Sequence, residues 1–161
     1  MIQAAMCFLL KENGGDKEAL LAMKKGGFGQ GKLNGVGGKL DRNKGDKNIQ
    51  DTVIREVEEE IGVKIKKSEE VAVLNFSHPY LTNPEEKEWQ VHIFLAREWE
   101  GEPTEHEEVN PKWFKINEVP YDEMWPDRKF WLPRVFNGEK IKANFIYKSD
   151  EIIGSYQLGQ R

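Results

Sequence analysis

The chain reads Arg55-Glu56-Val57-Glu58-Glu59-Glu60-Ile61-Gly62-Val63 from residue 55 to residue 63, an acidic segment in which apolar residues recur at regular intervals. Residues 48–61 contain no Gly or Pro, and at about 100° per residue four apolar side chains fall on one side of a helix. These side chains belong to Val53, Ile54, Val57 and Ile61. Gly62 follows, where a helix commonly ends in the left-handed conformation. The segment therefore predicts an amphipathic helix.

Three glutamates share another face of this predicted helix. Glu59 and Glu60 follow Glu56 by three and four residues, so their carboxylates are neighbours. Arg55 stands four residues before Glu59, within reach of an ion pair. Carboxylates so close raise one another's pKa unless a cation neutralises them, and oxygen ligands on one face suit Mg²⁺ or Mn²⁺. The alternative is a solvated acidic face, because Glu-rich helices are common.

Glycines precede the predicted helix in a pattern that indicates close approach of the backbone to another group. Gly35, Gly37 and Gly38 lie before it, and a helix N-terminus offers further amide donors to an anion. Upstream, residues 24–34 form a glycine-rich, positively charged loop that contains Phe28. By itself such a loop predicts phosphate binding only weakly. Because this loop leads into the segment predicted to bind a metal, we expect it to form one wall of a pocket.

Composition narrows the class of protein. With 161 residues and 38% hydrophobic content, the chain fits one domain over residues 1–161. A formal net charge of -4 gives no reason to expect nonspecific binding to nucleic acid. The single cysteine, Cys7, excludes an internal disulfide and lies in an apolar run typical of a buried thiol. No apolar stretch is long enough to span a bilayer and no signal peptide is evident, so we expect a soluble cytoplasmic protein.

The rest of the chain predicts a sheet and a second helix. Apolar runs between turn residues indicate strands over residues 2–10, 18–24, 71–77, 89–99, 112–116, 141–148 and 151–157. An aromatic-rich segment after Pro126 predicts a core helix, with Asp127 as its N-cap. The order of elements indicates an α+β fold, a mixed sheet with helices on its faces. Three histidines lack metal-ligand spacing and are interpreted as structural or surface residues: His78, His92 and His106.

The glycines and the acidic helix together resemble the signature of the Nudix hydrolases. That pattern has a glycine, a glutamate and then Arg-Glu-apolar-x-Glu-Glu-x-Gly-apolar, and residues 55–63 match its second half at every position. The first half departs, because Lys47 occupies the place of the family glutamate, eight residues before Arg55, in a lengthened loop. Asp46 is the candidate replacement. The resemblance implies a Nudix-type α/β/α sandwich with a mixed sheet and the signature loop-helix-loop.

The resemblance also implies a metal site and a catalytic role for the acidic helix. It implies that Mg²⁺, for which Mn²⁺ can substitute, is held by carboxylates and by a backbone carbonyl at Gly37 or Gly38. Arg55 is expected to orient Glu59 rather than to touch substrate. Glu108 resembles a downstream glutamate that completes the metal cluster or acts as general base. The implied carboxylate ligands are Glu56, Glu59, Glu60 and Glu108.

Segments outside the signature resemble one branch of the superfamily, the MutT homologues that hydrolyse oxidised purine nucleoside triphosphates. The matching segments include Leu20-Leu21-Ala22-Met23-Lys24-Lys25, Asn34-Gly35-Val36-Gly37-Gly38-Lys39, Val91-His92-Ile93-Phe94, Met124-Trp125-Pro126-Asp127 and the final hairpin. The resemblance implies that an asparagine and an aspartate bond to the purine while aromatic side chains enclose it. The implied base-site residues are Asn34, Asp127, Trp125, Phe28, Lys24 and Phe76.

Two positions depart from that branch near the expected base site. The family often has two aspartates after Trp-Pro, whereas this chain has Asp127 followed by Arg128. Two adjacent carboxyls that exchange protons can present donor or acceptor patterns, and one carboxyl beside a guanidinium cannot do so equally well. Arg128 could turn outward, contact O6 or N7 of the base, or pair with Asp127 and close the site. Trp89 stands where a smaller residue is common, which predicts a different pocket shape.

We therefore expect a Mg²⁺-dependent pyrophosphohydrolase that converts oxidised purine (deoxy)nucleoside triphosphates, such as 8-oxo-dGTP, to the monophosphate and pyrophosphate. One alternative is a Nudix hydrolase of another nucleoside diphosphate-linked substrate, such as a sugar nucleotide, a dinucleoside polyphosphate or an RNA 5′ end. A second alternative is a noncatalytic nucleotide-sensing module, which would have no need of the metal ligands. We expect a small nucleotide as the only partner, no nucleic-acid polymer, no membrane, and a monomer or weak homodimer.

Overall fold

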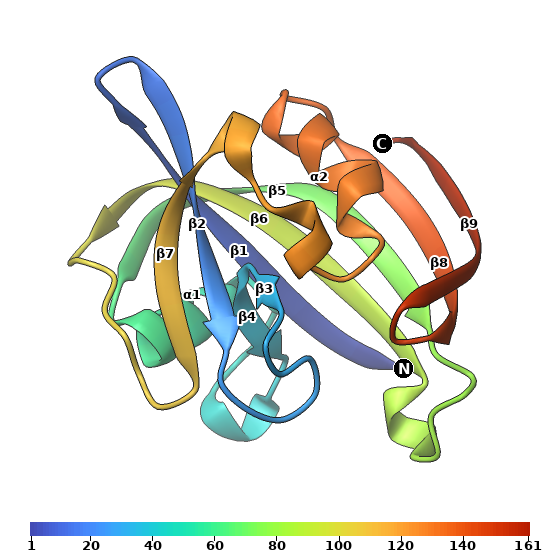
Figure 1. Cartoon of the computed structure of the whole chain (residues 1–161). Coiled ribbons are helices and arrows are strands. Elements are labelled where there is room, and N and C mark those ends of the chain that lie inside the picture. The colour runs from blue at the N-terminus through green and yellow to red at the C-terminus, as the bar shows by residue number, and fades with distance from the viewer.

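The computed structural model describes residues 1–161 and consists of nine strands, two α-helices and four short 3-10 helices (Figure 1). The strands are β1 (Ile2–Asn13), β2 (Asp16–Lys24), β3 (Leu33–Asn34), β4 (Val36–Lys39), β5 (Lys64–Ser77), β6 (Glu88–Glu100), β7 (Val109–Lys115), β8 (Ile141–Ser149) and β9 (Ile152–Gln160). The helices are α1 (Ile49–Ile61), α2 (Arg128–Phe136), and the 3-10 helices η1 (Arg42–Lys44), η2 (Pro84–Glu86), η3 (Ile116–Glu118) and η4 (Tyr121–Glu123).

The strands form one mixed sheet, as the order of elements predicted. Its path runs β3-β2-β1-β6-β5-β8-β9, with β4 paired to β1 and β7 paired to β2. The pairs β1·β6 and β5·β8 are parallel, whereas the β1·β2 and β8·β9 hairpins are antiparallel. Figure 1 shows β8 and β9 at the opposite end of the molecule from β7. The α+β class and the final hairpin are thus confirmed.

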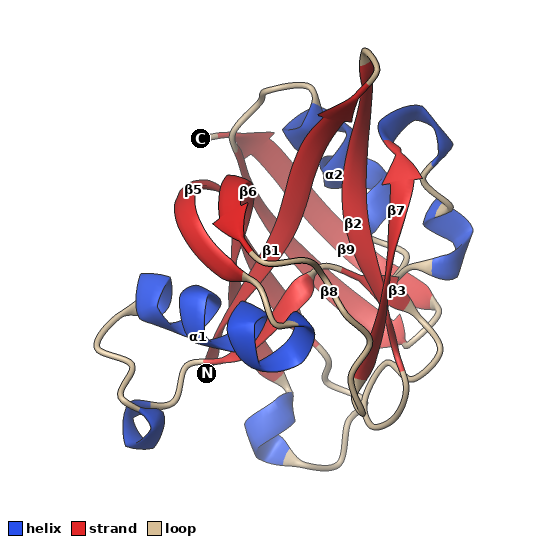
Figure 2. Ribbon diagram, turned by 90° about the vertical axis from the view of Figure 1, so that its left-hand side faces the viewer, coloured by secondary structure: helices blue, strands red, loops and turns tan.

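The two helices cover separate parts of this sheet, each over its own group of buried residues (Figure 2). The core beneath α1 includes Val53 and Val57 with Cys7 and Phe94 from the sheet. The larger core includes Trp131 and other side chains of α2 with strand residues from β1, β5, β6 and β8. Burial of these apolar side chains, at roughly 25 cal/mol per Å² removed from water, is the main force that fixes the helices to the strands.

Helix α1 ends at Gly62 as its sequence predicts, and Asn48 caps its start. The Asn48 side chain accepts a hydrogen bond from the backbone N–H of Asp51, and Gly62 ends the helix at φ 72°. The apolar face differs from the prediction at one position, because Ile54 is 39% exposed. Thr52 is buried instead, since its hydroxyl donates to Asp46 at 2.9 Å and so satisfies its polar group inside the protein.

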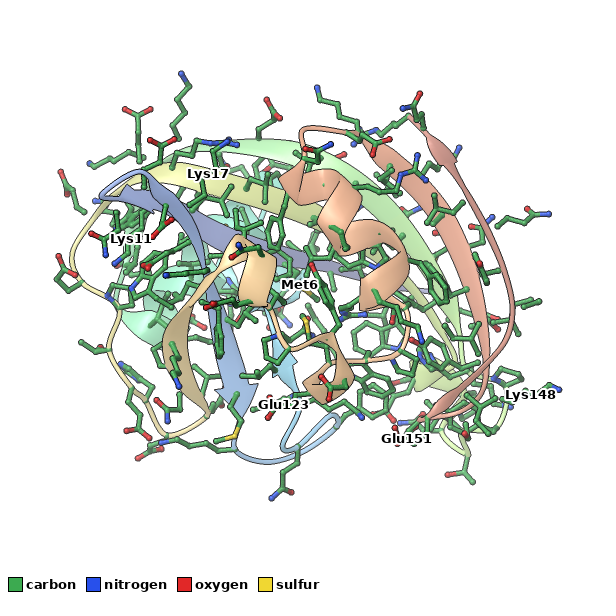
Figure 3. All side chains as sticks on the ribbon, turned by 45° about the horizontal axis from the view of Figure 1, so that its top comes forward. Met6, Lys11, Lys17, Glu123, Lys148 and Glu151 are labelled. Atoms are coloured by element: carbon green, nitrogen blue, oxygen red, sulfur yellow. The ribbon has the colours of Figure 1, made fainter.

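The glycine-rich segment before α1 forms β4, which the sequence did not predict to be a strand. Gly37 pairs with Met6 of β1, a half-buried residue labelled in Figure 3. A Cβ added to Gly37 would lie 1.9 Å from the carbonyl oxygen of Ala5. Only glycine therefore allows β4 to approach β1 so closely. The segment also lies alongside α1, where Gly38 faces Glu56.

Two further sequence expectations concern the cysteine and membrane spans. Cys7 is a free, buried thiol, and burial raises its pKa well above the ordinary range. Neither α1 nor α2 is long and apolar enough to cross a membrane.

Candidate active site

A cleft of about 570 Å³ joins the acidic face of α1 to an aromatic region under α2. It contains most of the residues that the sequence singled out: Lys24, Phe28, Asn34, Gly37, Gly38, Glu56, Glu60, Phe76, Glu108, Trp125, Asp127 and Arg128. Glu59 lies outside this cleft, in an adjoining acidic hollow that shares Glu56, Glu60 and Glu108 with it. Arg55 lines neither space and lies behind the glutamates.

Glu60 has the most perturbed carboxyl group at the acidic end of the cleft. Burial, followed by the charges of Glu56 and Glu108, raises the pKa of Glu60 to about 8. The charge of Lys24 and a hydrogen bond from the backbone of Gly37 act in the opposite direction. Burial likewise raises the pKa of Glu56. Carboxylates that repel one another in a partly buried place are a donor set that a hard divalent cation would stabilise.

Gly38 leaves room for the carboxylate of Glu56. A Cβ at this position would lie 2.5 Å from Cδ of Glu56 and 2.6 Å from its Oε1. The backbone of β4 and the side chain of Glu56 therefore touch, as a site that combines carboxylates with a backbone carbonyl requires. This contact supplies a physical reason for the second glycine of the Gly-Gly pair, distinct from the reason for Gly37.

Arg55 is held behind the glutamates by Asp46. Nε of Arg55 donates to Asp46 at 2.8 Å and Nη2 donates at 2.7 Å, while Nη1 donates to Glu56 at 2.9 Å and to Glu59 at 3.2 Å. Asp46 also accepts from the Thr52 hydroxyl and from the backbone N–H of Asp41. The guanidinium lowers the pKa of Asp46 well below its usual range. Asp46 thus forms the ion pair that Lys47 cannot form.

The acidic side chains do not yet surround a common point. No group of three or more His, Cys, Asp or Glu residues gathers around one position where a metal could lie. Nη1 of Arg55 lies between Glu56 and Glu59, and Lys44 approaches Glu59 at 3.7 Å. The donors therefore have the chemistry of a cation site, and binding would require glutamate side chains to rotate towards a common point.

The other end of the cleft is lined by aromatic rings. The ring centroids of Phe28 and Trp125 lie 5.0 Å apart, and those of Phe28 and Trp89 lie 6.5 Å apart with nearly parallel planes. Trp89, at the position expected to change the pocket shape, lies in the lining. At the rim, Lys32 pairs at 3.0 Å with Glu151, which Figure 3 shows at the turn between β8 and β9. Flat apolar walls of this kind suit a planar base.

Arg128 adopts one of the three arrangements that the sequence left open: it pairs with Asp127. Nη1 of Arg128 donates to both carboxylate oxygens, at 2.8 and 2.7 Å. Nε and Nη2 donate to Oδ1 of Asn34, at 3.3 and 3.1 Å. Asp127 is fully buried, Arg128 is 5% exposed, and both line the cleft. Asp127 occupies the N-cap position of α2 as predicted, but its side chain makes no capping hydrogen bond and pairs with Arg128 instead.

His78 also belongs to the cleft, which the spacing of histidines could not reveal. It is 5% exposed, its Nδ1 has no hydrogen-bond partner, and burial lowers its pKa. Its ring stacks on Tyr147 at 5.2 Å. The signal in the sequence was alternation, because His78 follows Phe76 by two residues at the end of a strand and so faces the same side.

A model of the NUDIX domain family matches residues 2–135. The chain is 36% identical to the oxidized purine nucleoside triphosphate hydrolase of Mus musculus, over 88% of this chain and 86% of the mouse protein. It is 33% identical to the protein of the same name from Danio rerio, over 88% of this chain and 86% of that protein. The chain therefore belongs to the Nudix hydrolases.

A solved structure agrees with this assignment. The crystal structure of a MutT protein from Bacillus halodurans matches with a TM-score of 0.77, over 98% of this chain and 97% of that one. Its sequence identity of 24% makes it a likeness of fold. The mixed sheet with two helices is thus the Nudix fold, as the resemblance implied.

Proposed function

We propose that this protein hydrolyses oxidised purine (deoxy)nucleoside triphosphates, such as 8-oxo-dGTP, to the monophosphate and pyrophosphate. The observation that carries the proposal is the single cleft that joins clustered carboxylates to an aromatic end with polar groups. A nucleotide needs both halves, because its phosphates require cations and its base requires flat apolar walls with hydrogen-bonding groups. The names of the mouse and zebrafish relatives support the same substrate class.

The phosphates would lie between the acidic helix face and the lysines of the cleft. Lys24 and Lys39 line it and can approach phosphate oxygens directly. Glu56, Glu59, Glu60 and Glu108, with a carbonyl of Gly37 or Gly38, are the residues that would hold Mg²⁺. A bound divalent cation supplies neutralisation of phosphate charge and a lowered pKa for a water molecule. Mn²⁺ has similar ligand preferences and can substitute.

The protein's own residues would perform the remaining tasks. Arg55 holds Glu56 and Glu59 in place and is itself held by Asp46. Glu60, with a pKa near 8, and Glu108 are the candidates to accept a proton from the attacking water. The rings of Phe28 and Trp125 would enclose the base, with Phe76 in the wall behind it.

Arg128, which stands where the family often has a second aspartate, favours one alternative function. This alternative is a Nudix hydrolase that acts on another nucleoside diphosphate-linked substrate. The ion pair between Arg128 and Asp127 changes the polar groups at the aromatic end of the cleft, where the base would bind. It does not alter the acidic end of the cleft. The phosphate chemistry would therefore be common to both candidates, and only the group bound at the aromatic end would differ.

A substrate panel with the purified protein and Mg²⁺ tests the proposal. It compares 8-oxo-dGTP and 2-hydroxy-dATP with ADP-ribose, a UDP-sugar, diadenosine polyphosphate and capped RNA, with Glu59→Gln as the inactive control. We expect the oxidised triphosphates to have the highest kcat/KM. Preference for one of the other compounds would instead establish the alternative, and failure of a folded protein to hydrolyse any of them would favour a nucleotide-sensing role.

A further inference from the structure

The orientation of the Asn34 side-chain amide is fixed by Arg128. Two guanidinium nitrogens, Nε and Nη2, lie 3.3 and 3.1 Å from the same atom of Asn34. A guanidinium has donors only, so the atom that faces it must be the carbonyl oxygen Oδ1. The two N–H groups of Nδ2 are therefore directed away from Arg128. Asn34 lines the cleft, so this amide can offer a substrate donors but no free acceptor facing Arg128.

The carboxylate of Asp127 is occupied by the protein itself. Oδ2 accepts from Nε1 of Trp131 at 2.7 Å, Oδ1 accepts from the Tyr147 hydroxyl, and Nη1 of Arg128 donates to both oxygens. Three donor groups thus share a side chain that has no exposed surface. Any base that used Asp127 as an acceptor would first have to displace one of them, leaving a buried donor without a partner.

From these contacts we infer that the base end of the cleft offers hydrogen-bond donors from Arg128 and Asn34, and that it selects purines with a carbonyl oxygen at position 6 over purines with an amino group there. Nη1 and Nε of Arg128 are used within the protein, whereas Nη2 has a second N–H beyond its bond to Asn34. Asp127 is then a positioning residue that holds Arg128. The inference rests on the proposed function and specifies its substrate.

The chemistry of the two purine classes explains the selection. O6 of a guanine-type base is an acceptor and can take hydrogen bonds from Nη2 of Arg128 and Nδ2 of Asn34. An adenine-type base has an amino group at the same place, so donor would face donor and the guanidinium would lose solvation without compensation. Nδ1 of His78, which also lines this cleft, is buried and has no hydrogen-bond partner within the protein.

Three triphosphates that are all oxidised at C8 but differ at position 6 or position 2 show how much position 6 contributes to substrate selection. 8-oxo-dGTP and 8-oxo-dITP have the carbonyl oxygen, whereas 8-oxo-dATP has the amino group, and 8-oxo-dITP lacks the 2-amino group of guanine. We expect the first two to have a kcat/KM about 10- to 100-fold above that of 8-oxo-dATP, the discrimination of one good pair of base contacts. Calorimetric binding of the three monophosphates should follow the same order.

Two substitutions test the residues that are responsible. Arg128→Asp replaces donors by acceptors and should bring the ratio of kcat/KM for 8-oxo-dGTP and 8-oxo-dATP towards one. The matched control is Lys129→Asp, the same change of charge at an exposed neighbour, which should keep the wild-type ratio. If Arg128→Asp fails to fold, Asn34→Asp retains a partner for Arg128 and adds an acceptor, so it should also reduce the ratio.

The outcomes separate this inference from the proposed function. Equal turnover of all three triphosphates would overturn the selection at position 6 and leave the proposed function standing. High turnover of 8-oxo-dGTP with low turnover of both others would assign the preference to the 2-amino group and would also overturn it. Absence of turnover and of monophosphate binding in the folded wild-type protein would remove the proposed function and the inference together.

Discussion

Asp46 and Arg55 form a two-point ion pair, with distances of 2.8 Å to Nε and 2.7 Å to Nη2, directly behind the acidic face of α1. The carboxylate comes from the residue before Lys47, which occupies the glutamate position of the family pattern. The longer loop between β4 and α1 contains η1 and returns the chain so that Asp46 is buried against Thr52. Asp46 therefore supplies, from the position before Lys47, the carboxylate that supports Arg55.

Replacement of Asp46 by Asn should weaken both the fold and the activity. The substitution removes a buried carboxylate from a nearly buried arginine, for which a loss of about 3 kcal/mol in the free energy of unfolding is expected. Activity should fall at least about tenfold, because Glu56 and Glu59 lose the support of Arg55. Urea unfolding and steady-state kinetics measure the two effects. Lys47→Ala is the matched control and should change neither quantity, since the Lys47 side chain is exposed.

The stabilising effect of Asp46 should also depend on pH. The pKa of Asp46 is lowered in the folded protein, so the folded state binds fewer protons than the unfolded state at acid pH. Stability from this pair is present above the ordinary carboxyl pKa and is lost as pH falls through and below it. The difference in unfolding free energy between wild type and Asp46→Asn should therefore shrink in acid. A difference that stayed constant down to about pH 3 would contradict the assignment.

Gly37→Ala and Gly38→Ala should have different effects although the residues are neighbours. At Gly37 the new Cβ would meet the backbone of Ala5, so β4 must move from β1, and a loss of about 1–3 kcal/mol in stability is expected. At Gly38 it would meet the end of the Glu56 side chain, which can rotate away. Gly38→Ala should therefore reduce activity with a smaller loss of stability. Equal destabilisation by both substitutions, measured by thermal unfolding, would be inconsistent with these contacts.

Glu60 should make the metal-free protein less stable as pH rises. Its pKa is raised from the ordinary 4.5 to about 8, so within this window the folded state retains a proton that the unfolded state releases. By linkage, stability falls as pH increases through the window. In EDTA, the melting temperature of the wild type should therefore fall as the pH rises through this window. Glu60→Gln should remove this part of the pH dependence. Mg²⁺ should stabilise the wild type more at about pH 8.5 than at about pH 5.5, because it binds the ionised carboxylates.

Glu60→Gln should remove activity without unfolding the protein. The amide is nearly isosteric, relieves repulsion with Glu56 and Glu108, and can neither hold a cation nor accept a proton in the same way. A fall in kcat of about 100-fold or more is expected. Glu58→Gln, on an exposed position of the same helix, serves as control and should retain wild-type turnover. Near wild-type kcat for Glu60→Gln would show that the acidic face has another role.

Much of this fold could be predicted because helix periodicity and turn residues are local features of the sequence. The period of α1, its glycine end and the turns of the first and last hairpins each depend on neighbouring residues, and the structure confirms them. β4 escaped prediction because its glycines have no side chains to show alternation. Ile54 followed the helical period yet is exposed, because the core beneath α1 extends only to Val53, Val57 and Ile61 on that side.

The sequence indicated many residues of the candidate site, but it indicated few of the contacts between them. Glu56, Glu60 and Glu108 line one cleft with the glycines and aromatic residues that the family pattern indicated, whereas Glu59 lies in the adjoining hollow. The state of Arg128 depended on Asn34 and Tyr147, which are distant in sequence and contact Arg128 or Asp127 only in the folded chain. The sequence could name the alternatives for Arg128, whereas the choice between them required the tertiary structure.

The most direct test of the account is the release of pyrophosphate from 8-oxo-dGTP, 2-hydroxy-dATP, dGTP and dATP, measured in parallel with Mg²⁺ and with Glu59→Gln as control. We predict pyrophosphate and the monophosphate as products, the highest kcat/KM for 8-oxo-dGTP, and loss of turnover in the variant. No turnover of any of the four by a folded protein, or turnover that Glu59→Gln retains in full, would contradict the proposed function of the cleft.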